Sequence, residues 1–358
     1  MRQEQMYCAV LPEQNRKNSM IKTPYYIAHP KRIAENYRLM RETLPVDRLY
    51  YATKANGEAP TLRALIAEGA GLEIVCADEM EHLLSLGVSA EDMICSRPVK
   101  TAEEIARMYA LGCRCFVYDS ESQYELLRRY SPEAKKLVRL NMRFVSPRDL
   151  VFGMYPEEIA AMARRGILPD GYTFYIFERD NWAKKLDAVF DALEALLSLH
   201  ESSAKLLLDL GGHYVLPGEA EAGVYETLRE RTEKLRRLHP ALTVIAEPGG
   251  CIVNSAYDLV TTVTETRNGD WVFLDTDANQ IRSRPSIEPY DKIEKCAVRP
   301  LYFLDSLCSG NLIRIQDADY VPKTGDRLII RSVGAYSICF SNRFHWVGKP
   351  QILVEEDA

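Results

Sequence analysis

Eight short apolar segments alternate with helical patterns between residues 49 and 246, and this alternation constrains the fold more than any other feature. The segments are rich in β-branched and aromatic residues and have the length of strands that are buried on both faces. Their ranges are Leu49–Thr53, Gly71–Val75, Met93–Ser96, Cys115–Tyr118, Leu137–Asn141, Thr173–Phe177, Leu206–Leu210 and Leu242–Ala246. Such a chain predicts an α/β fold, a (β/α)8 TIM-like barrel. A doubly wound open sheet is the alternative, but no GxGxxG motif follows an early strand to support it.

Helical patterns precede and separate these segments, and several carry residues that start a helix. Their ranges are 31–43, Ala59–Glu68, Asp78–Leu86, Thr101–Leu111, Ser120–Arg129, Pro156–Arg165, Ala183–His200 and Tyr225–Leu238. Thr101 and Pro156 each stand just before acidic residues, as at helix N-termini.

From about residue 261 the chain becomes β-rich and long helical patterns are absent. The segments are Thr261–Thr266, Trp271–Asp275, Ile293–Val298, Arg327–Val333 and Ala335–Phe340, with turn residues between them. This pattern predicts a mainly antiparallel β domain. We therefore predict two domains, a barrel over residues 23–260 and a β domain over residues 261–358. Residues 1–22 can contribute a strand to the β domain through Met6–Leu11.

Composition excludes several classes of function. The net charge is -6 and no basic tract is present, which argues against nucleic acid as a partner. No apolar run approaches the roughly 20 residues that span a bilayer, and residues 1–22 lack the apolar core of a signal peptide. The nine cysteines form no CxxC pair and indicate reduced thiols in the cytoplasm. The six histidines show no metal-ligand spacing, so no metal site is predicted.

Polar residues at the ends of the predicted strands indicate the chemistry, because catalytic groups of a barrel gather on the loops after its strands. Lys54 follows the first strand, where a partly dry site would disfavour the ammonium and make the amine a nucleophile. Arg139 lies in the fifth strand. The glycine-rich turns Gly211-Gly212-His213 and Glu247-Pro248-Gly249-Gly250 follow the seventh and eighth strands. Bare backbone N–H groups there suit a phosphate, and a phosphate site opposite a lysine suggests pyridoxal phosphate held as a Schiff base.

Motifs over nearly the whole chain resemble those of the fold-type III pyridoxal-phosphate decarboxylases, the ornithine, diaminopimelate and carboxynorspermidine decarboxylase group. The matching motifs are Tyr51-Ala52-Thr53-Lys54-Ala55-Asn56, Leu210-Gly211-Gly212-His213, Glu247-Pro248-Gly249, Gly334-Ala335-Tyr336 and Arg284-Pro285. The resemblance implies that the barrel binds pyridoxal 5'-phosphate and that the active sites are shared within a homodimer.

The same resemblance assigns roles to single residues. Lys54 would form the Schiff base, and Glu247 would face the pyridine nitrogen and keep it protonated. Arg139 would lie near Glu247, and the Tyr336 hydroxyl would reach the cofactor phosphate together with the two glycine turns. Arg284 would contact the substrate.

The chain departs from the family pattern at several of these positions. Tyr175 stands near the place of a histidine that stacks on the cofactor, and could stack there in its stead. His213 replaces the third glycine of the phosphate turn, and Gly250 replaces an arginine that would contact phosphate or carboxylate. Glu73 replaces an early aspartate.

The largest departure lies in Asp305–Asn311, the segment that the family lends across the dimer interface. Alignment without a gap puts Leu307 at the family's cysteine, whereas alignment on Cys308 needs a one-residue deletion. Cys308 is our candidate for the acid that the partner chain supplies. Asn311 replaces the acid that pairs with the distal ammonium of the substrate, and a neutral amide cannot balance a buried ammonium.

These observations predict a pyridoxal-phosphate-dependent decarboxylase whose small-molecule substrate is an amino acid or an amino-acid derivative. The distal end of the substrate would not be a free ammonium, as in a siderophore, antibiotic or polyamine-type pathway. A racemase-type enzyme of the same fold is one alternative, and product analysis would distinguish carbon dioxide from an inverted amino acid. The other alternative is a non-catalytic homologue that binds a partner, against which Lys54, Glu247 and Tyr336 together argue.

Overall fold

The computed structural model describes residues 9–11, 21–147, 151–282, 285–308, 310–341 and 348–355. Its contacts group the chain into two compact units. One unit comprises residues 37–54 and 65–249, and the other comprises residues 1–36, 55–64 and 250–358. The predicted domains, residues 23–260 and 261–358, are parts of the chain that would fold independently. Their boundaries stay a prediction.

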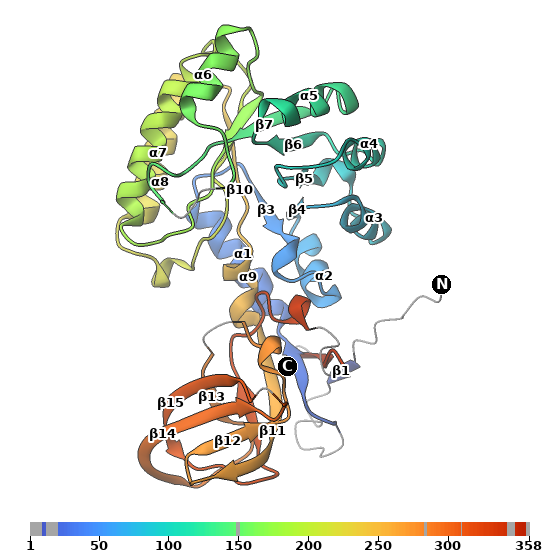
Figure 1. Ribbon diagram of the computed structural model, residues 1–358, viewed down its shortest axis with the longest axis vertical. Helices are drawn as coiled ribbons and strands as arrows, with labels where there is room; N and C mark the ends of the chain where they lie inside the picture. Colours follow the sequence, from blue (N-terminus) through green and yellow to red (C-terminus); the bar gives the residue numbers. More distant parts are fainter. Residues whose placement is uncertain are drawn as a thin grey trace. The chain divides into compact units, whose positions relative to one another are not determined.

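The first unit is a closed barrel of eight parallel strands in the order β10-β3-β4-β5-β6-β7-β8-β9 (Figure 1). The strands are β3 (Arg48–Ala52), β4 (Gly71–Ile74), β5 (Met93–Cys95), β6 (Cys115–Tyr118), β7 (Lys135–Arg139), β8 (Gly171–Thr173), β9 (Leu207–Asp209) and β10 (Thr243–Ala246). The predicted fold class is therefore confirmed. Side chains from β5, β6, β7, β9 and β10, including Ile94, Val117 and Ile245, form one buried cluster. Strands that are not neighbours can meet only across the interior, so this cluster fills the barrel.

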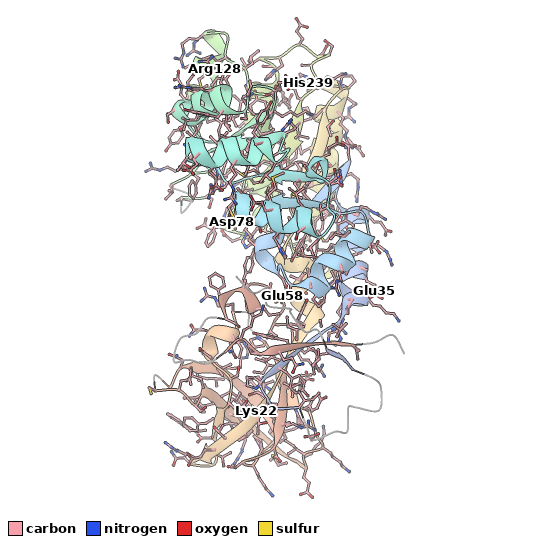
Figure 2. All side chains as sticks on the ribbon, turned by 90° about the vertical axis from the view of Figure 1, so that its right-hand side faces the viewer. Lys22, Glu35, Glu58, Asp78, Arg128 and His239 are labelled. Carbon is pink, nitrogen blue, oxygen red and sulfur yellow. The ribbon has the colours of Figure 1, made fainter. Side chains whose placement is uncertain are left out.

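The helices also agree with the sequence pattern. They are α1 (Pro30–Thr43), α2 (Ala59–Ala67), α3 (Ala77–Ser85), α4 (Ala102–Ala110), α5 (Glu121–Tyr130), α6 (Pro156–Arg164), α7 (Trp182–Leu197), α8 (Val224–Leu238) and α9 (Gly250–Val253). The Thr101 hydroxyl accepts the Glu104 N–H and so caps α4. Charged side chains such as Asp78 on α3 and Arg128 on α5 lie on exposed faces (Figure 2). No described helix is long and apolar enough to cross a membrane.

The second unit contains a nine-stranded, mainly antiparallel sheet. Its strands are β1 (Ala9–Leu11), β2 (Tyr25–Ala28), β11 (Tyr257–Arg267), β12 (Trp271–Leu274), β13 (Ile287–Pro289), β14 (Lys295–Asp305), β15 (Leu312–Tyr320), β16 (Arg327–Ile330) and β17 (Gln351–Glu355). The N-terminal strand β1 pairs in parallel with β17. The strand predicted over Ala335–Phe340 is wrong, because Tyr336 has a φ of 58° and Ile338–Phe340 form a 3-10 turn.

Candidate active site

Lys54 stands at the carboxyl end of β3, in the short 3-10 turn Thr53–Ala55. Its Nζ lies 2.7 Å from Glu73 Oε2 and donates a hydrogen bond to it. The lysine side chain is 47% exposed, whereas that of Glu73 is 0% exposed. The activation of this amine by burial stays a prediction. The carboxyl group of Glu73, on the neighbouring strand β4, holds the amine in place.

Glu73 is a buried acid with one satisfied oxygen. Its Oε2 accepts the lysine, but its Oε1 has no hydrogen-bond partner. Burial raises the pKa of Glu73 to about 8; Lys54 opposes this shift and the nearby Glu247 adds to it. A carboxyl so placed retains a proton at neutral pH and can exchange it with the amine beside it.

The turn after β9 has no room for side chains at two positions. A Cβ atom on Gly211, whose φ is 67°, would lie 2.0 Å from the Phe174 carbonyl oxygen. A Cβ atom on Gly212 would lie 2.6 Å from the Glu247 carbonyl oxygen. Only glycine fits, and the turn presents bare backbone. Among the residues that the structure describes, the Gly212 N–H has no hydrogen-bond partner. A phosphate would satisfy such a donor.

Glu247 follows β10 and is the second acid of the site. Its backbone N–H donates to the Gly211 carbonyl oxygen at 2.7 Å, which joins the two glycine-rich turns. The Ser96 hydroxyl donates to Glu247 Oε1. Burial raises the pKa of Glu247 to about 8, and the charge of Asp209 adds to that shift. Lys54, Ser96 and Arg139 oppose it.

Aromatic rings and one guanidinium stack beside the glycine turn. The Tyr175 and His213 rings are stacked with centroids 5.6 Å apart. Phe177 lies on His213 at 5.9 Å, and Arg139 Cζ lies 5.6 Å from the centroid of Tyr175. Because β8 ends at Thr173, Tyr175 belongs to the loop after the strand and not to the strand itself. Its ring is engaged by two neighbours, and its stacking on a cofactor stays a prediction.

Lys54, Glu73, Glu247, Arg139 and the glycine turn thus meet at the carboxyl ends of the barrel strands, and known proteins share this arrangement. Residues 30–150 match the family described as pyridoxal-dependent decarboxylase, pyridoxal binding domain. The chain is 28% identical over 358 residues to the lysine/ornithine decarboxylase of Selenomonas ruminantium, covering 94% of this chain and 91% of that protein. It is 27% identical over 376 residues to the diaminopimelate decarboxylase of Pseudomonas aeruginosa, covering 93% of this chain and 88% of that protein. A crystal structure of lysine decarboxylase from Selenomonas ruminantium aligns with a TM-score of 0.79 and 25% identity over 98% of each chain. The chain is therefore similar to pyridoxal-dependent decarboxylases over more than nine-tenths of its length.

The second unit of the decarboxylase carries the tyrosine motif. The Tyr336 N–H donates to the carbonyl oxygen of Ala55, the residue after Lys54, at 2.8 Å. The Asn56 side chain donates to the Gly334 carbonyl oxygen at 3.0 Å. A Cβ atom on Gly250 would lie 3.6 Å from the Tyr336 ring. The motif is therefore anchored to the segment that leaves Lys54, while the contact of Tyr336 with phosphate stays a prediction. Gly249 is buried at the end of the barrel unit.

The decarboxylase segment 305–311 is organised by Asp305, which is completely buried. Asp305 Oδ1 accepts the backbone N–H groups of Leu307 and Asn311, and its Oδ2 accepts the Asn311 side-chain amide at 3.1 Å. Cys308 is exposed. Arg284 lies outside the described residues, so its predicted contact with substrate is untested.

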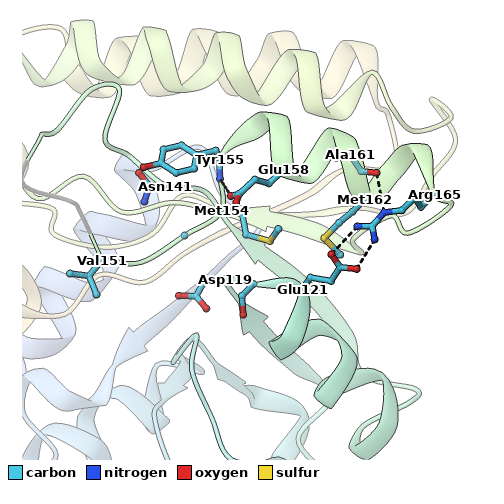
Figure 3. A pocket seen from close by; sticks show the side chains of 12 residues that line it. Asp119, Glu121, Asn141, Val151, Met154, Tyr155, Glu158, Ala161, Met162 and Arg165 are labelled. Carbon is cyan, nitrogen blue, oxygen red and sulfur yellow. Dashed lines mark hydrogen bonds and ion pairs between the residues drawn. The ribbon is translucent and has the colours of Figure 1, made fainter.

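A cavity of about 450 Å³ lies beside β6 and β7 of the decarboxylase barrel (Figure 3). Arg165 forms an ion pair with Glu121 there at 2.8 Å, and Glu158 accepts the Tyr155 N–H. Asp119, which follows β6, also lines the cavity. This cavity was not predicted, because its lining residues come from segments that are far apart in the sequence.

Two polar residues of the decarboxylase site were missed by sequence reasoning. Asp209 ends β9 directly before the glycine turn, and Ser96 follows β5. Their position at strand ends is the signal that could have found them.

Proposed function

We propose that the chain decarboxylates an amino acid whose distal end is not a free ammonium, with Lys54 as the residue that anchors pyridoxal phosphate. The observation that carries the proposal is the meeting of an amine, the buried carboxyl of Glu73, the partly buried carboxyl of Glu247 and a turn without side chains, all within one barrel unit. The residues fit the cofactor. Lys54 offers an amine at a strand end, and Gly212 offers a backbone donor without a partner among the described residues. Glu247 offers a carboxyl that can hold a proton.

Pyridoxal phosphate, when bound, supplies a ring that accepts the electron pair left on the substrate when carbon dioxide departs. Two carboxyl groups of the chain support that chemistry, one by holding a proton and one by holding the lysine. Glu247 holds a proton near neutral pH, as a partner for a basic ring nitrogen must. Glu73 holds the Lys54 ammonium whenever the amine is not bonded to the cofactor. The lysine side chain therefore stays in position throughout the reaction.

The segment 305–311 supports a substrate without a distal ammonium. Its acid, Asp305, is occupied by three donors from the segment itself. Asn311 carries no charge, so neither residue offers a free carboxylate to an ammonium. Cys308 is exposed and is our proposed proton donor to the product, supplied by the partner chain. An acidic, neutral or acylated distal end suits this segment better than an amine.

We also propose that the protein acts as a homodimer. A row of apolar side chains crosses β12, β14 and β15, where Trp271 pairs with Tyr302 and Tyr302 pairs with Ile315. Trp271 is 41% exposed and Ile315 is 49% exposed. Apolar residues so exposed on neighbouring strands are a feature of association surfaces. Replacement of Ile315 by Glu should shift the mass in light scattering from dimer to monomer, whereas Asp317→Asn on the same strand should leave it unchanged.

A cytoplasmic location completes the proposal. All cysteines among the described residues are free, as expected for thiols in a reducing compartment. Localisation of a tagged full-length chain by fractionation would test this.

The test of the activity is a visible absorption spectrum of the purified chain with added pyridoxal phosphate, before and after borohydride. Wild type should show a band that reduction fixes covalently to the protein, and Lys54→Ala should show none. Lys135→Ala, which removes an exposed lysine at the opposite end of β7, is the matched control and should behave as wild type. Absence of the band in wild type would remove the cofactor from the proposal.

A carbon dioxide release assay then identifies the substrate. Acidic and acylated amino acids should release carbon dioxide, with no inversion of the unreacted substrate. Free L-ornithine or L-lysine as the best substrate, with kcat/KM of about 10⁴ M⁻¹s⁻¹ or above, would contradict the proposed distal group.

A further inference from the structure

Lys100 is a buried lysine, with only 4% of its surface exposed, at the end of the segment 96–100 between β5 and α4. Its ammonium donates to the carbonyl oxygens of Arg97 at 2.5 Å, Pro98 at 3.2 Å and Val117 at 2.6 Å. An ammonium has three N–H donors, so every donor of this buried group is satisfied. Burial lowers the pKa of Lys100 to about 8, which leaves the side chain charged at neutral pH.

The ammonium joins the segment 96–100 to the neighbouring strand of the barrel. Two of its acceptors belong to the segment itself, whereas Val117 lies in β6. Gln123 of α5 holds the same segment, because its Oε1 accepts the Lys100 N–H and its Nε2 donates to the Lys100 carbonyl oxygen, both at 3.0 Å. Buried carbonyl groups that lose a donor cost free energy, so removal of the ammonium would release the segment from β6.

The same segment begins with Ser96, which directly follows β5. The Ser96 hydroxyl donates to Oε1 of Glu247, which directly follows β10. Because β3 and β4 separate these two strands in the barrel, strand pairing alone does not bring the two side chains together. The backbone of Glu247 is held separately, by its N–H bond to the Gly211 carbonyl oxygen. The orientation of the Glu247 carboxyl therefore depends on where the segment 96–100 places the Ser96 hydroxyl.

We propose that Lys100 is a positioning residue, which fixes the segment 96–100 on β6 so that the Ser96 hydroxyl holds the Glu247 carboxyl in one orientation. This inference rests on the proposed function only in what Glu247 faces, since the hydrogen bonds belong to the barrel unit itself. A carboxyl that is oriented before a ligand arrives needs no rearrangement when the ligand binds. Lys100 thus acts on the site through Ser96 and not by contact with a ligand.

The test is infrared spectroscopy of the full-length chain without cofactor at pH 7, with ¹³C-labelled glutamate carboxyl groups. The band of Glu247 is identified by its loss in Glu247→Gln. Ser96→Ala should shift this band to higher wavenumber, because a carboxyl that loses a hydrogen-bond donor has a stronger C=O bond. Lys100→Met, which removes the ammonium but keeps a side chain of similar length, should shift the band in the same direction by a similar amount.

The double variant separates an effect through Ser96 from a direct effect of the lost charge. Added to Ser96→Ala, Lys100→Met should cause no further shift, because the hydroxyl through which it acts is already absent. A direct effect of the charge would instead add its full shift in the double variant.

Lys136→Met is the matched control. Lys136 is also buried, and its ammonium donates to the carbonyl oxygens of Pro132 at 3.0 Å and Ala134 at 2.7 Å, at the amino end of β7. Its replacement should lower the urea concentration at which the chain unfolds, as Lys100→Met does, but should leave the Glu247 band in place.

Circular dichroism shows whether each variant is folded. If Lys100→Met does not fold, Gln123→Met, which frees the backbone of Lys100 and retains the ammonium, should still shift the Glu247 band. An unshifted band in Ser96→Ala or in the folded clamp variant, a full additional shift in the double variant, or an equal shift in Lys136→Met would overturn the inference. Because neither cofactor nor turnover is measured, such a failure is distinct from absence of cofactor binding or of carbon dioxide release.

Discussion

Replacement of Glu73 by Gln should make the barrel less sensitive to alkaline pH. Glu73 is 0% exposed, its Oε1 has no hydrogen-bond partner, and its pKa is raised to about 8, chiefly by burial. In the unfolded chain the same carboxyl titrates near its ordinary value of 4.5. The folded state therefore binds this proton more tightly than the unfolded state does. The stabilisation is complete below the unfolded pKa and is lost as pH rises through the folded pKa.

The size of the effect follows from the two pKa values. Between pH 6 and pH 8 the unfolded carboxyl is ionised, whereas the folded carboxyl goes from protonated to half ionised. The free energy of unfolding then falls by up to about 1.4 kcal/mol per pH unit, and by about 2.3 kcal/mol over this interval. Water that reaches the half-exposed Lys54 reduces this figure, so we expect about 2 kcal/mol. A glutamine does not titrate and cannot contribute to the loss.

The assay is urea unfolding of the full-length chain without cofactor at pH 6 and pH 9, for wild type and Glu73→Gln. Wild type should lose about 2 kcal/mol more than the variant between the two pH values. Glu91→Gln, on an exposed turn of the same unit, is the matched control and should lose as much as wild type. Equal losses in wild type and Glu73→Gln would refute the reasoning, since burial of this carboxyl would then have no energetic consequence.

Three further predictions concern the turn, the ring stack and the second acid. Gly211→Ala should lower the free energy of unfolding by about 2–4 kcal/mol in the urea assay, because the added Cβ atom would meet the Phe174 carbonyl oxygen. Gly218→Ala is the control and should be close to neutral, because nothing lies within 4 Å of its added Cβ atom. Tyr175→Ala should weaken cofactor binding about tenfold in a fluorescence titration by removing the ring beneath the guanidinium, whereas Tyr175→Phe should retain most of the affinity. Ser96→Ala removes a donor that lowers the pKa of Glu247, so the alkaline limb of the pH–rate profile should move to higher pH, by less than about one unit.

The barrel could be predicted from the sequence because buried parallel strands are nearly uninterrupted apolar segments. Cys115–Tyr118 agrees with β6 at both ends. Differences arise where polar residues belong to a strand. The segment Leu137–Asn141 was placed by its apolar residues, yet β7 begins at Lys135. Lys136 is buried there because its Nζ donates to the carbonyl oxygens of Pro132 and Ala134, a solution that no sequence pattern displays.

The β unit was less predictable for a related reason. In β15, charged and apolar residues share the strand, so the segment Leu312–Tyr320 lacks a clear alternation and was missed. The end of the chain around Tyr336 was read as a strand because of its composition. Its backbone instead follows the contact with Ala55, a partner almost three hundred residues away that composition cannot reveal.

Within the site, motifs located the amine, the glycine turn and Glu247, but not the state of their protons. The sequence predicts a lysine whose amine is activated by desolvation. The structure assigns the buried position to Glu73 and leaves the lysine half exposed. Which of two groups is buried depends on the strand-to-strand register, here Ala52 beside Glu73, and not on the motif itself.

The path of the chain through its two units bears on how such a protein can be divided or recombined. Residues 55–64 leave the barrel unit immediately after Lys54 and belong to the unit that also contains residues 250–358. Asn56 and Thr61 bond there to Gly334 and Tyr257. A truncation near residue 260 would therefore strip the segment after the anchoring lysine of its partners and would not liberate an intact barrel. Grafting of the β unit from a relative would require residues 55–64 to be exchanged with it, because they belong to the same compact unit.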